Sequence, residues 1–194
     1  MAEVILTTPR LNLRLWEERD LDHWLTHLNT AQVKAYLGGV QAPETVAERF
    51  AKLKTAWHDD GFSFLAAELR EDGEFLGTCG IARIASECAP ASLKSAVQIG
   101  WQLRADRWGR GYATEAAHAV LAMACERFEL SIVYAQTSER NRGSWRVMQR
   151  LGLRRLAELD YEDPDYPPED NPTMVWGITQ EGWANAHAKA AVRV

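Results

Sequence analysis

Apolar and polar residues alternate along several short stretches of the chain, and each stretch predicts a β-strand because successive strand side chains point to opposite faces. Leu11 and Leu13, each flanked by polar residues, are the clearest case. The predicted strands span residues 10–16, 62–66, 75–84, 97–103, 132–137, 153–161 and 173–178. The Asp72-Gly73 pair before the third stretch predicts a hairpin turn.

Elsewhere apolar residues recur at helical spacing. The predicted helices span residues 20–28, 43–58, 114–128, 142–151 and 181–192. Asp20 is expected to cap the first helix, Pro43 suits the first turn of the second, and Gly152 is expected to follow the fourth in a left-handed conformation. This mixture of strands and helices, without a linker rich in Gly, Ser or Pro, predicts a single α+β domain over residues 1–194 around a mixed sheet.

The composition excludes several classes of protein. With 46% hydrophobic and 25% charged residues, the chain resembles an ordinary globular protein and not a disordered one. The net charge of −5 argues against a general nucleic-acid binder. Three widely spaced cysteines fit neither a disulfide framework nor a zinc site, so we expect reduced thiols, no metal and a cytoplasmic location. No signal peptide is visible at residues 1–10, and the longest apolar stretch is too short to span a membrane.

The charge is distributed unevenly along the chain. Residues 104–155 hold ten arginines and five acids, a net charge of +5, so the remainder carries −10. An arginine-rich block inside an acidic chain predicts a bound polyanion, and the alternative is a solvated helix surface.

A glycine loop between a predicted strand and a predicted helix is the most informative motif. Gly109 and Gly111 permit backbone angles that other residues avoid, and the following helix directs free N–H groups and the positive end of its dipole at the loop. This arrangement predicts a phosphate cradle. The loop lacks the Gly-Lys-Ser/Thr of a P-loop, and Thr114 occupies the third glycine position of a dinucleotide fingerprint. Three arginines surround the loop, namely Arg104, Arg107 and Arg110.

The stretch Trp108-Gly109-Arg110-Gly111-Tyr112-Ala113 resembles the pyrophosphate loop Gln/Arg-x-x-Gly-x-Gly/Ala of the GCN5-related N-acetyltransferase (GNAT) superfamily, apart from its first residue. Three further blocks resemble the ribosomal-protein-alanine N-acetyltransferase (RimJ/RimL-type) branch of that superfamily. They are Thr8-Pro9-Arg10-Leu11-x-Leu13-Arg14, Ile99-Gly100-Trp101, and Asn141-x-x-Ser144-x-x-Val147-x-x-x-Leu151-Gly152-Leu153. The resemblance covers residues 7–178 and implies the GNAT fold, a mixed, mostly antiparallel sheet flanked by helices and splayed at the acetyl-CoA site.

The resemblance also implies a reaction. Acetyl would pass from acetyl-CoA to a primary amine by direct attack in a ternary complex, without an acyl-enzyme. Loop amides would hold the pyrophosphate, the end of the preceding strand would line the pantetheine, and Asn141 would contact the pantetheine arm. The implied cofactor-binding residues are Gln102, Leu103, Arg104, Trp108, Gly109, Arg110, Gly111, Tyr112, Ala113, Thr114, Asn141 and Ser144.

The catalytic residues depart from the family pattern. Met148 stands where many members have a tyrosine acid, so Ser144 or a water is expected to protonate the CoA thiolate. Gln98 occupies the region where some members have a glutamate base. Asp160, in the acidic stretch 158–170, is the candidate base, and a solvated loop is the alternative for that stretch. The other candidates are Glu68, Glu115 and His118, with helix-dipole stabilisation as the simpler role for Glu115.

Two of the implied cofactor or catalytic residues also have a simpler structural interpretation. Asn141 is placed to cap a helix, and Ser144 lies in that helix's first turn.

Tyr36 is a candidate for the border of the acceptor pocket. The branch resemblance favours a protein N-terminal α-amine, with a small amine such as an antibiotic or polyamine, a non-catalytic acyl-CoA sensor, and nucleotide oxidoreduction as alternatives. An oligomer is compatible with the sequence, which assigns no oligomeric state.

Overall fold

The computed structural model describes residues 2–191, and side chains as far as residue 186. The chain folds as two compact units, each described here by itself. Unit 1 comprises Met1–Ala82 and Gly100–Val120, and unit 2 comprises Arg83–Ile99 and Leu121–Val194.

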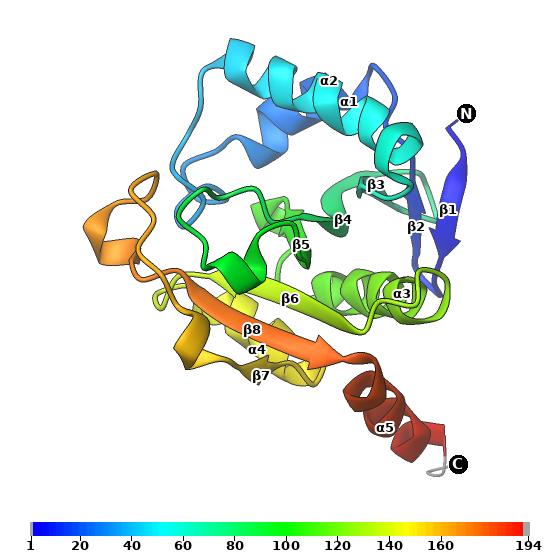
Figure 1. Cartoon of the computed structure of the whole chain (residues 1–194). Helices are drawn as coiled ribbons and strands as arrows, with labels where there is room; N and C mark the ends of the chain where they lie inside the picture. The colour runs from blue at the N-terminus through cyan, green and yellow to red at the C-terminus, as the bar shows by residue number, and fades with distance from the viewer. Residues whose placement is uncertain (1, 192–194) are drawn as a thin grey trace. The chain divides into compact units, whose positions relative to one another are not determined.

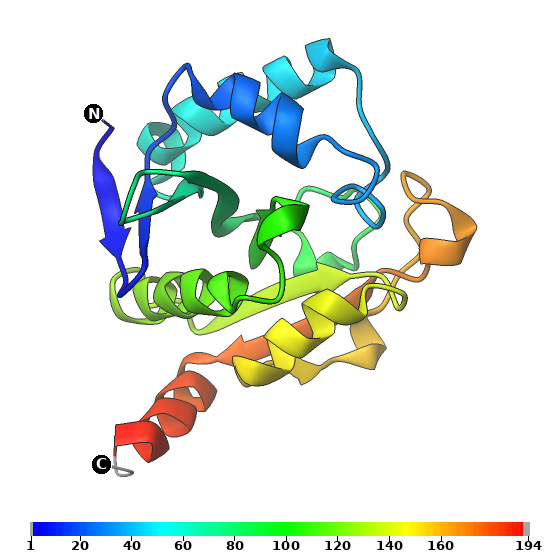
Figure 2. The same ribbon diagram turned by 180° about the vertical axis from the view of Figure 1, so that it is seen from behind.

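Unit 1 contains the antiparallel strands β1 (Val4–Thr7), β2 (Leu11–Arg14), β3 (Phe64–Leu69) and β4 (Phe75–Arg83). The second half of β5 (Val97–Leu103) follows β4 in the strand order. Two helical segments lie side by side over this part of the sheet (Figures 1 and 2). The first is α1 (Asp20–His23), which continues as a π-helical turn over Trp24–Leu28, and the second is α2 (Pro43–Asp60).

An aromatic core joins these helices to the strands of unit 1. The Trp16 ring lies 5.3 Å from the Trp24 ring and 5.5 Å from the Phe50 ring, measured between centroids. The Trp16 indole N–H donates to the Phe64 carbonyl at 2.8 Å, so the only polar group of this side chain is satisfied. The remaining members of the buried cluster are Leu28, Val46, Ala66 and Phe75.

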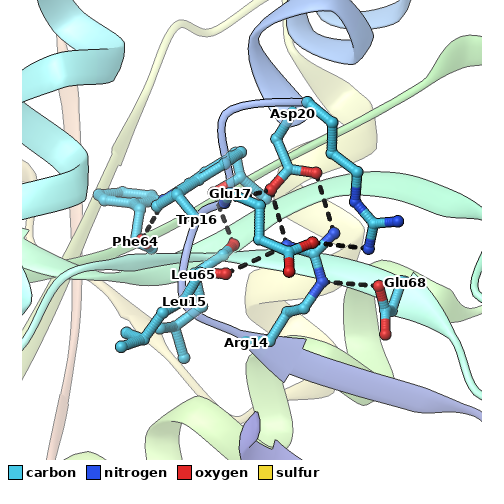
Figure 3. Close-up of polar contacts among 10 residues, drawn as sticks. Arg14, Leu15, Trp16, Glu17, Asp20, Phe64, Leu65 and Glu68 are labelled. Carbon is cyan, nitrogen blue, oxygen red and sulfur yellow. Dashed lines mark hydrogen bonds and ion pairs between the residues drawn. The ribbon is translucent and has the colours of Figure 1, made fainter. Parts of the chain in front are cut away.

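A buried ion-pair network connects β2, α1 and β3 (Figure 3). Arg14 is 3% exposed, and its guanidinium contacts both Asp20 oxygens, at 2.7 and 2.9 Å, and the Glu68 carboxylate, at 2.6 Å. Burial alone would lower the pKa of Arg14, but the hydrogen bonds to Asp20 and Glu68 raise it above its ordinary value. The predicted capping role of Asp20 is therefore wrong. Asp20 is the first residue of α1, and its carboxylate serves Arg14 and the Glu17 N–H.

Unit 2 holds the first half of β5 together with β6 (Ile132–Thr137), β8 (Met174–Thr179) and β7 (Arg154–Arg155), in that order. β5 and β6 are parallel, with Gln98 opposite Tyr134, whereas β8 pairs antiparallel with both β6 and β7. Helix α4 (Arg142–Arg150) contacts β6, and α5 (Gln180–Ala191) follows β8 directly (Figure 2). Helix α3 (Tyr112–Glu126) begins in unit 1 and ends in unit 2.

The predicted α+β fold with a mixed, mostly antiparallel sheet is confirmed, and the eight strands follow the order β1-β2-β3-β4-β5-β6-β8-β7. Two predictions about strands fail. β1 is not among the predicted strands, and residues 153–161 form only the two-residue β7, a short 3₁₀ turn and an isolated bridge from Tyr161 to Thr173. Asp160 explains the interruption because its carboxylate binds the Val175 N–H at 3.0 Å, which replaces a ladder hydrogen bond.

Candidate functional site

The glycine loop lies between the end of β5 and the start of α3, as the sequence predicts. Gly109 and Gly111 have φ values of 77° and 84°, in the left-handed region that favours glycine. A Cβ at position 111 would lie 3.4 Å from the Arg10 guanidinium, whereas one at position 109 would meet nothing within 4 Å. The positive φ therefore favours glycine at both positions, and a side chain at position 111 would also contact Arg10.

The backbone N–H groups in the first turn of α3 point toward this loop. The Glu115 N–H donates to the Gly111 carbonyl at 3.0 Å, which closes the first helical hydrogen bond. By helix geometry the N–H groups of Tyr112, Ala113 and Thr114 have no acceptor within the helix, and together with the helix dipole they favour an anion. The loop is thus suited to bind an anion such as a phosphate group.

The arginines around the loop do not all contribute free charge, contrary to the expectation from the sequence. Arg104 forms a bidentate pair with Asp106, at 2.8 and 2.9 Å, and it also contacts Glu74. Arg107 forms a second bidentate pair with Glu74, at 3.0 and 2.7 Å. Among the side chains that the structure describes, none forms a hydrogen bond or ion pair with the exposed Arg110 side chain. Arg110 is therefore the loop arginine that is available to a phosphate.

A clamp from the N-terminal segment holds the loop, and the sequence analysis missed this function. The Arg10 guanidinium donates to the Arg110 carbonyl at 3.0 Å and to the Glu115 carboxylate at 2.6 Å, and it stacks 4.6 Å from the centre of the Tyr112 ring. The Thr8 hydroxyl and the Arg10 N–H also donate to Glu115, at 2.6 and 2.9 Å. The Thr8-Pro9-Arg10 block, noted only as a resemblance, was the available signal.

The same contacts explain the ionisation state of the Glu115 carboxyl. Burial alone would raise the pKa of this carboxyl, but the hydrogen bonds from Thr8 and Arg10 outweigh burial and hold the pKa below its ordinary value. A carboxylate with this many donors stays ionised and is a weak proton acceptor. Glu115 therefore serves the clamp, and the helix-dipole role predicted for it is compatible with that position.

The residues before the loop contact other parts of unit 1. The Gln102 side chain donates to the Leu28 carbonyl at 3.0 Å, and Leu103 is buried. The Trp108 indole N–H donates to the Leu103 carbonyl at 2.8 Å, while 48% of the residue stays exposed. Trp108 thus closes the turn in which the family motif has Gln or Arg.

The second group of predicted residues lies in unit 2, at the start of α4. The Asn141 side chain accepts a hydrogen bond from the Ser144 N–H at 3.2 Å, so the predicted capping role of Asn141 is confirmed. Ser144 is half-buried, and its hydroxyl forms no hydrogen bond with any side chain or backbone group that the structure describes. Met148 is 2% exposed and packs in the core of this unit.

Asp160 and its neighbours in the acidic stretch are extensively hydrogen-bonded. Asp160 forms a bidentate ion pair with Arg155 in addition to its bond to the Val175 N–H. Asp163 accepts from the Ser86 hydroxyl at 2.8 Å, and Asp170 accepts from the Ser138 hydroxyl at 3.2 Å. The stretch is therefore not a simple solvated loop, because several of its acids help to order it.

The other candidates are placed as follows. Glu68 belongs to the Arg14 network, and the exposed His118 lines a surface pocket of about 260 Å³ together with Thr8 and Glu115. Tyr36 is half-buried in the segment between α1 and α2.

The three cysteines are unpaired. Within residues 2–191, no helix is long and apolar enough to cross a membrane, and no group of three or more His, Cys, Asp or Glu residues is arranged to hold a metal ion.

Comparison with known proteins finds acetyltransferases both among family models and among solved structures. A family model described as "Acetyltransferase (GNAT) domain" matches residues 10–154. The protein YkkB of Bacillus subtilis is 30% identical over 155 residues, which cover 78% of this chain and 86% of YkkB. A crystal structure of an acetyltransferase from Agrobacterium tumefaciens superposes with a TM-score of 0.72 at 28% identity, over 89% of this chain and 92% of that one.

Two structures with coenzyme A share the fold at lower identity. An aminoglycoside acetyltransferase AAC(6')-Ib matches with a TM-score of 0.74 at 19% identity, over 91% of this chain and 99% of its own. The ribosomal L7/L12 α-N-protein acetyltransferase RimL matches with a TM-score of 0.70 at 18% identity, over 91% of this chain and 98% of its own.

Proposed function

Because the chain belongs to the acetyltransferase (GNAT) domain family, we propose that it transfers acetyl from acetyl-CoA to a protein N-terminal α-amine by direct attack in a ternary complex. The amine nitrogen forms a bond to the thioester carbonyl carbon, the carbon–sulfur bond breaks, the amine loses a proton to a base, and the CoA thiolate gains one. The proposed domain is the whole chain, residues 1–194, acting in the cytoplasm.

The observation that carries this proposal is the glycine loop of unit 1. The left-handed Gly109 and Gly111 shape the loop, while the first-turn amides of α3 and the exposed Arg110 supply the positive groups for the CoA pyrophosphate. The Arg10 clamp fixes the loop through contacts within the chain, and a fixed loop loses less entropy on binding.

We assign the thiolate proton to Ser144 in unit 2. Its hydroxyl is half-buried and has no intramolecular hydrogen-bond partner among the described residues, so it can donate to a ligand. Asn141, whose side-chain carbonyl caps α4, keeps its amide N–H₂ group for the pantetheine arm. These roles come from the family resemblance, and the hydrogen bonding in unit 2 is compatible with them.

Asp160 is the candidate base, with a competing structural role. Its bonds to Arg155 and to the Val175 N–H connect the chain after β7 to β8, which is the structural role. Asp160→Asn separates the two roles. Loss of a base moves the pH dependence of kcat, whereas loss of a structural bond lowers the unfolding temperature and leaves that pH dependence unchanged.

The proposed acceptor rests on the branch resemblance, and RimL, a ribosomal L7/L12 α-N-protein acetyltransferase, shares the fold. A small-molecule amine is the second candidate, since an aminoglycoside acetyltransferase shares the same fold. A non-catalytic acyl-CoA sensor is the third, because Met148 replaces the usual tyrosine acid.

The deciding experiment measures release of the CoA thiol with a panel of N-terminal peptides, aminoglycosides and polyamines. Peptide-dependent release by the wild type, strongly reduced in Ser144→Ala with unchanged acetyl-CoA affinity, supports the proposal. Tight acetyl-CoA binding without acceptor-dependent release indicates a sensor. If acetyl-CoA does not bind, the assignment of the loop fails.

A further inference from the structure

Three arginines line one face of α4 in unit 2. Arg142, Arg146 and Arg150 are all exposed, and they recur every four residues, which places them on the same side of the helix. The helix itself contains no acid. Among the residues that the structure describes, no acid forms an ion pair with any of the three. We call this set the arginine stripe.

The stripe differs from two other arginines of unit 2, which have acidic partners. Arg155 forms its bidentate pair with Asp160, and Arg140 lies 3.5 Å from the Asp170 carboxylate. Like charges at the i, i+4 spacing repel one another on a helix, and Arg142 stands in the first turn, where a positive charge opposes the helix dipole. The stripe is therefore unfavourable for the helix alone, and no acid of the described chain offsets it.

The rest of α4 fixes the stripe in place. Val147 and Met148 are buried, and α4 contacts β6 (Figure 2). Asn141 caps the helix, and the Arg142 guanidinium lies 4.3 Å from the centre of the Trp145 ring. Because the backbone below the stripe is anchored, a ligand that binds there loses less entropy than it would on a mobile segment.

The residue type and the spacing indicate the chemistry of a partner. A guanidinium is always charged and binds carboxylates and phosphates in a bidentate geometry. With a rise of about 1.5 Å per residue, side chains four positions apart lie about 6 Å apart along the helix axis. Alternate side chains of an extended peptide share a face and lie about 6.6 Å apart. An extended segment with acids at alternate positions therefore matches the stripe.

Two other polyanions fit this surface less well. Proteins that bind single-stranded nucleic acid without sequence preference stack bases on aromatic side chains, and helices on membrane surfaces insert apolar side chains. The large apolar residues that are exposed in the described chain are Val4, Val40 and Trp108, and none of them lies on α4. The stripe thus offers charge without an apolar or stacking surface, which favours an acidic protein segment.

We propose that the arginine stripe binds an extended, carboxylate-rich segment of the protein that accepts the acetyl group. The first turn of the same helix carries Ser144, to which the thiolate proton is assigned, so docking and chemistry would share one element. The identification of the docked protein as the acceptor rests on the proposed function, whereas the docking of an acidic segment does not.

The first experiment measures docking without reference to activity. Fluorescence anisotropy at low ionic strength follows a labelled, N-terminally blocked peptide of alternating glutamate and serine, and a peptide of alternating glutamine and serine is the neutral control. The wild type is expected to bind the acidic peptide, and added salt is expected to weaken binding by screening the charges. Arg146→Gln/Arg150→Gln is expected to lower the affinity about 10-fold, the sum of two exposed ion pairs.

The matched control is Arg83→Gln/Arg127→Gln, which removes two exposed arginines from the same unit and changes the net charge equally. An equal loss of affinity in both double variants would show that net charge attracts the peptide, and the inference fails. Oligothymidylate, vesicles of phosphatidylserine and phosphatidylcholine, and a second copy of the chain, followed by sedimentation, are the competing occupants. If binding of one of them depends on the stripe and binding of the acidic peptide does not, the inference is overturned.

The second experiment tests whether the docked protein is the acceptor. Two substrate peptides share a free N-terminus and a neutral leader, followed by alternating glutamate and serine or by alternating glutamine and serine. The wild type is expected to have a KM about 10-fold lower for the acidic peptide, and Arg146→Gln/Arg150→Gln is expected to lose this preference with kcat unchanged. Acetyl-CoA affinity, measured by calorimetry, should be the same in both proteins. A loss of that affinity would assign the stripe to the cofactor and overturn the inference.

The outcomes separate the inference from the proposed function. If no peptide is acetylated but the acidic peptide still binds through the stripe, the proposed function fails and the docking surface stands. If peptides are acetylated but neither binding nor KM depends on the stripe, the inference fails while the acetyltransferase function stands.

Discussion

The Arg10 guanidinium binds the Glu115 carboxylate at 2.6 Å across 105 residues of sequence, and through this contact the segment between β1 and β2 fixes the start of α3. The same guanidinium holds the Arg110 carbonyl of the glycine loop. The geometry of the proposed cofactor loop thus depends on a residue far from the loop in sequence.

Arg10→Gln should weaken acetyl-CoA binding about 10-fold, equivalent to roughly 1.4 kcal/mol, because the loop loses its clamp while its amides remain. Isothermal titration calorimetry with acetyl-CoA measures this change. Arg19→Gln, which removes an exposed pair with Glu17 in the same unit, is the control and should bind normally. Wild-type affinity in Arg10→Gln would show that the loop holds its conformation without the clamp.

Glu115→Gln should lower the stability at neutral pH by about 1 kcal/mol, since a neutral amide accepts more weakly from Arg10 and Thr8. The folded-state pKa of Glu115 lies below its ordinary value of 4.5, so its contribution is complete above that value and is lost as the pH falls through the lower folded pKa. Urea unfolding of both proteins from pH 7 to pH 3 should therefore show the stability difference shrinking below about pH 4.5. A constant difference would contradict the ionised role.

Gly111→Ala should reduce acetyl-CoA binding far more than it reduces stability. The left-handed angle costs about 1–2 kcal/mol for any residue with a Cβ. At position 111 the Cβ would also contact the Arg10 guanidinium, at 3.4 Å, beside the proposed cradle. Gly73→Ala has a similar φ of 75° and open space around it, so it carries the strain alone. Equal acetyl-CoA affinity in the two variants would refute the cradle.

Arg14→Met should destabilise the protein by about 3–5 kcal/mol, the usual cost of leaving buried carboxylates without their partner. Thermal unfolding monitored by circular dichroism gives the change. The double variant Arg14→Met/Asp20→Leu should recover part of the loss because one uncompensated charge is removed. No recovery would mean that packing around Arg14, and not charge, dominates the effect.

Local sequence patterns are sufficient to predict the elements that depend on nearby residues. β5 and β6 have the predicted bounds, Asn141 caps α4, and the glycines of the loop adopt left-handed angles, because each property depends on residues a few positions apart. The acetyltransferase family could be recognised for the same reason, since its motifs are short and occur in a fixed order.

Which charges are neutralised becomes evident from the folded chain and not from its sequence. The sequence shows ten arginines in one block, but Arg104 and Arg107 are paired with Asp106 and Glu74, and Arg155 is paired with Asp160. Likewise no hydrophobic or charge pattern in the sequence shows that Arg10 holds the glycine loop. Coulomb energy and burial depend on distances between atoms that the fold brings together from remote parts of the chain, and hydrophobic periodicity contains no information about those distances.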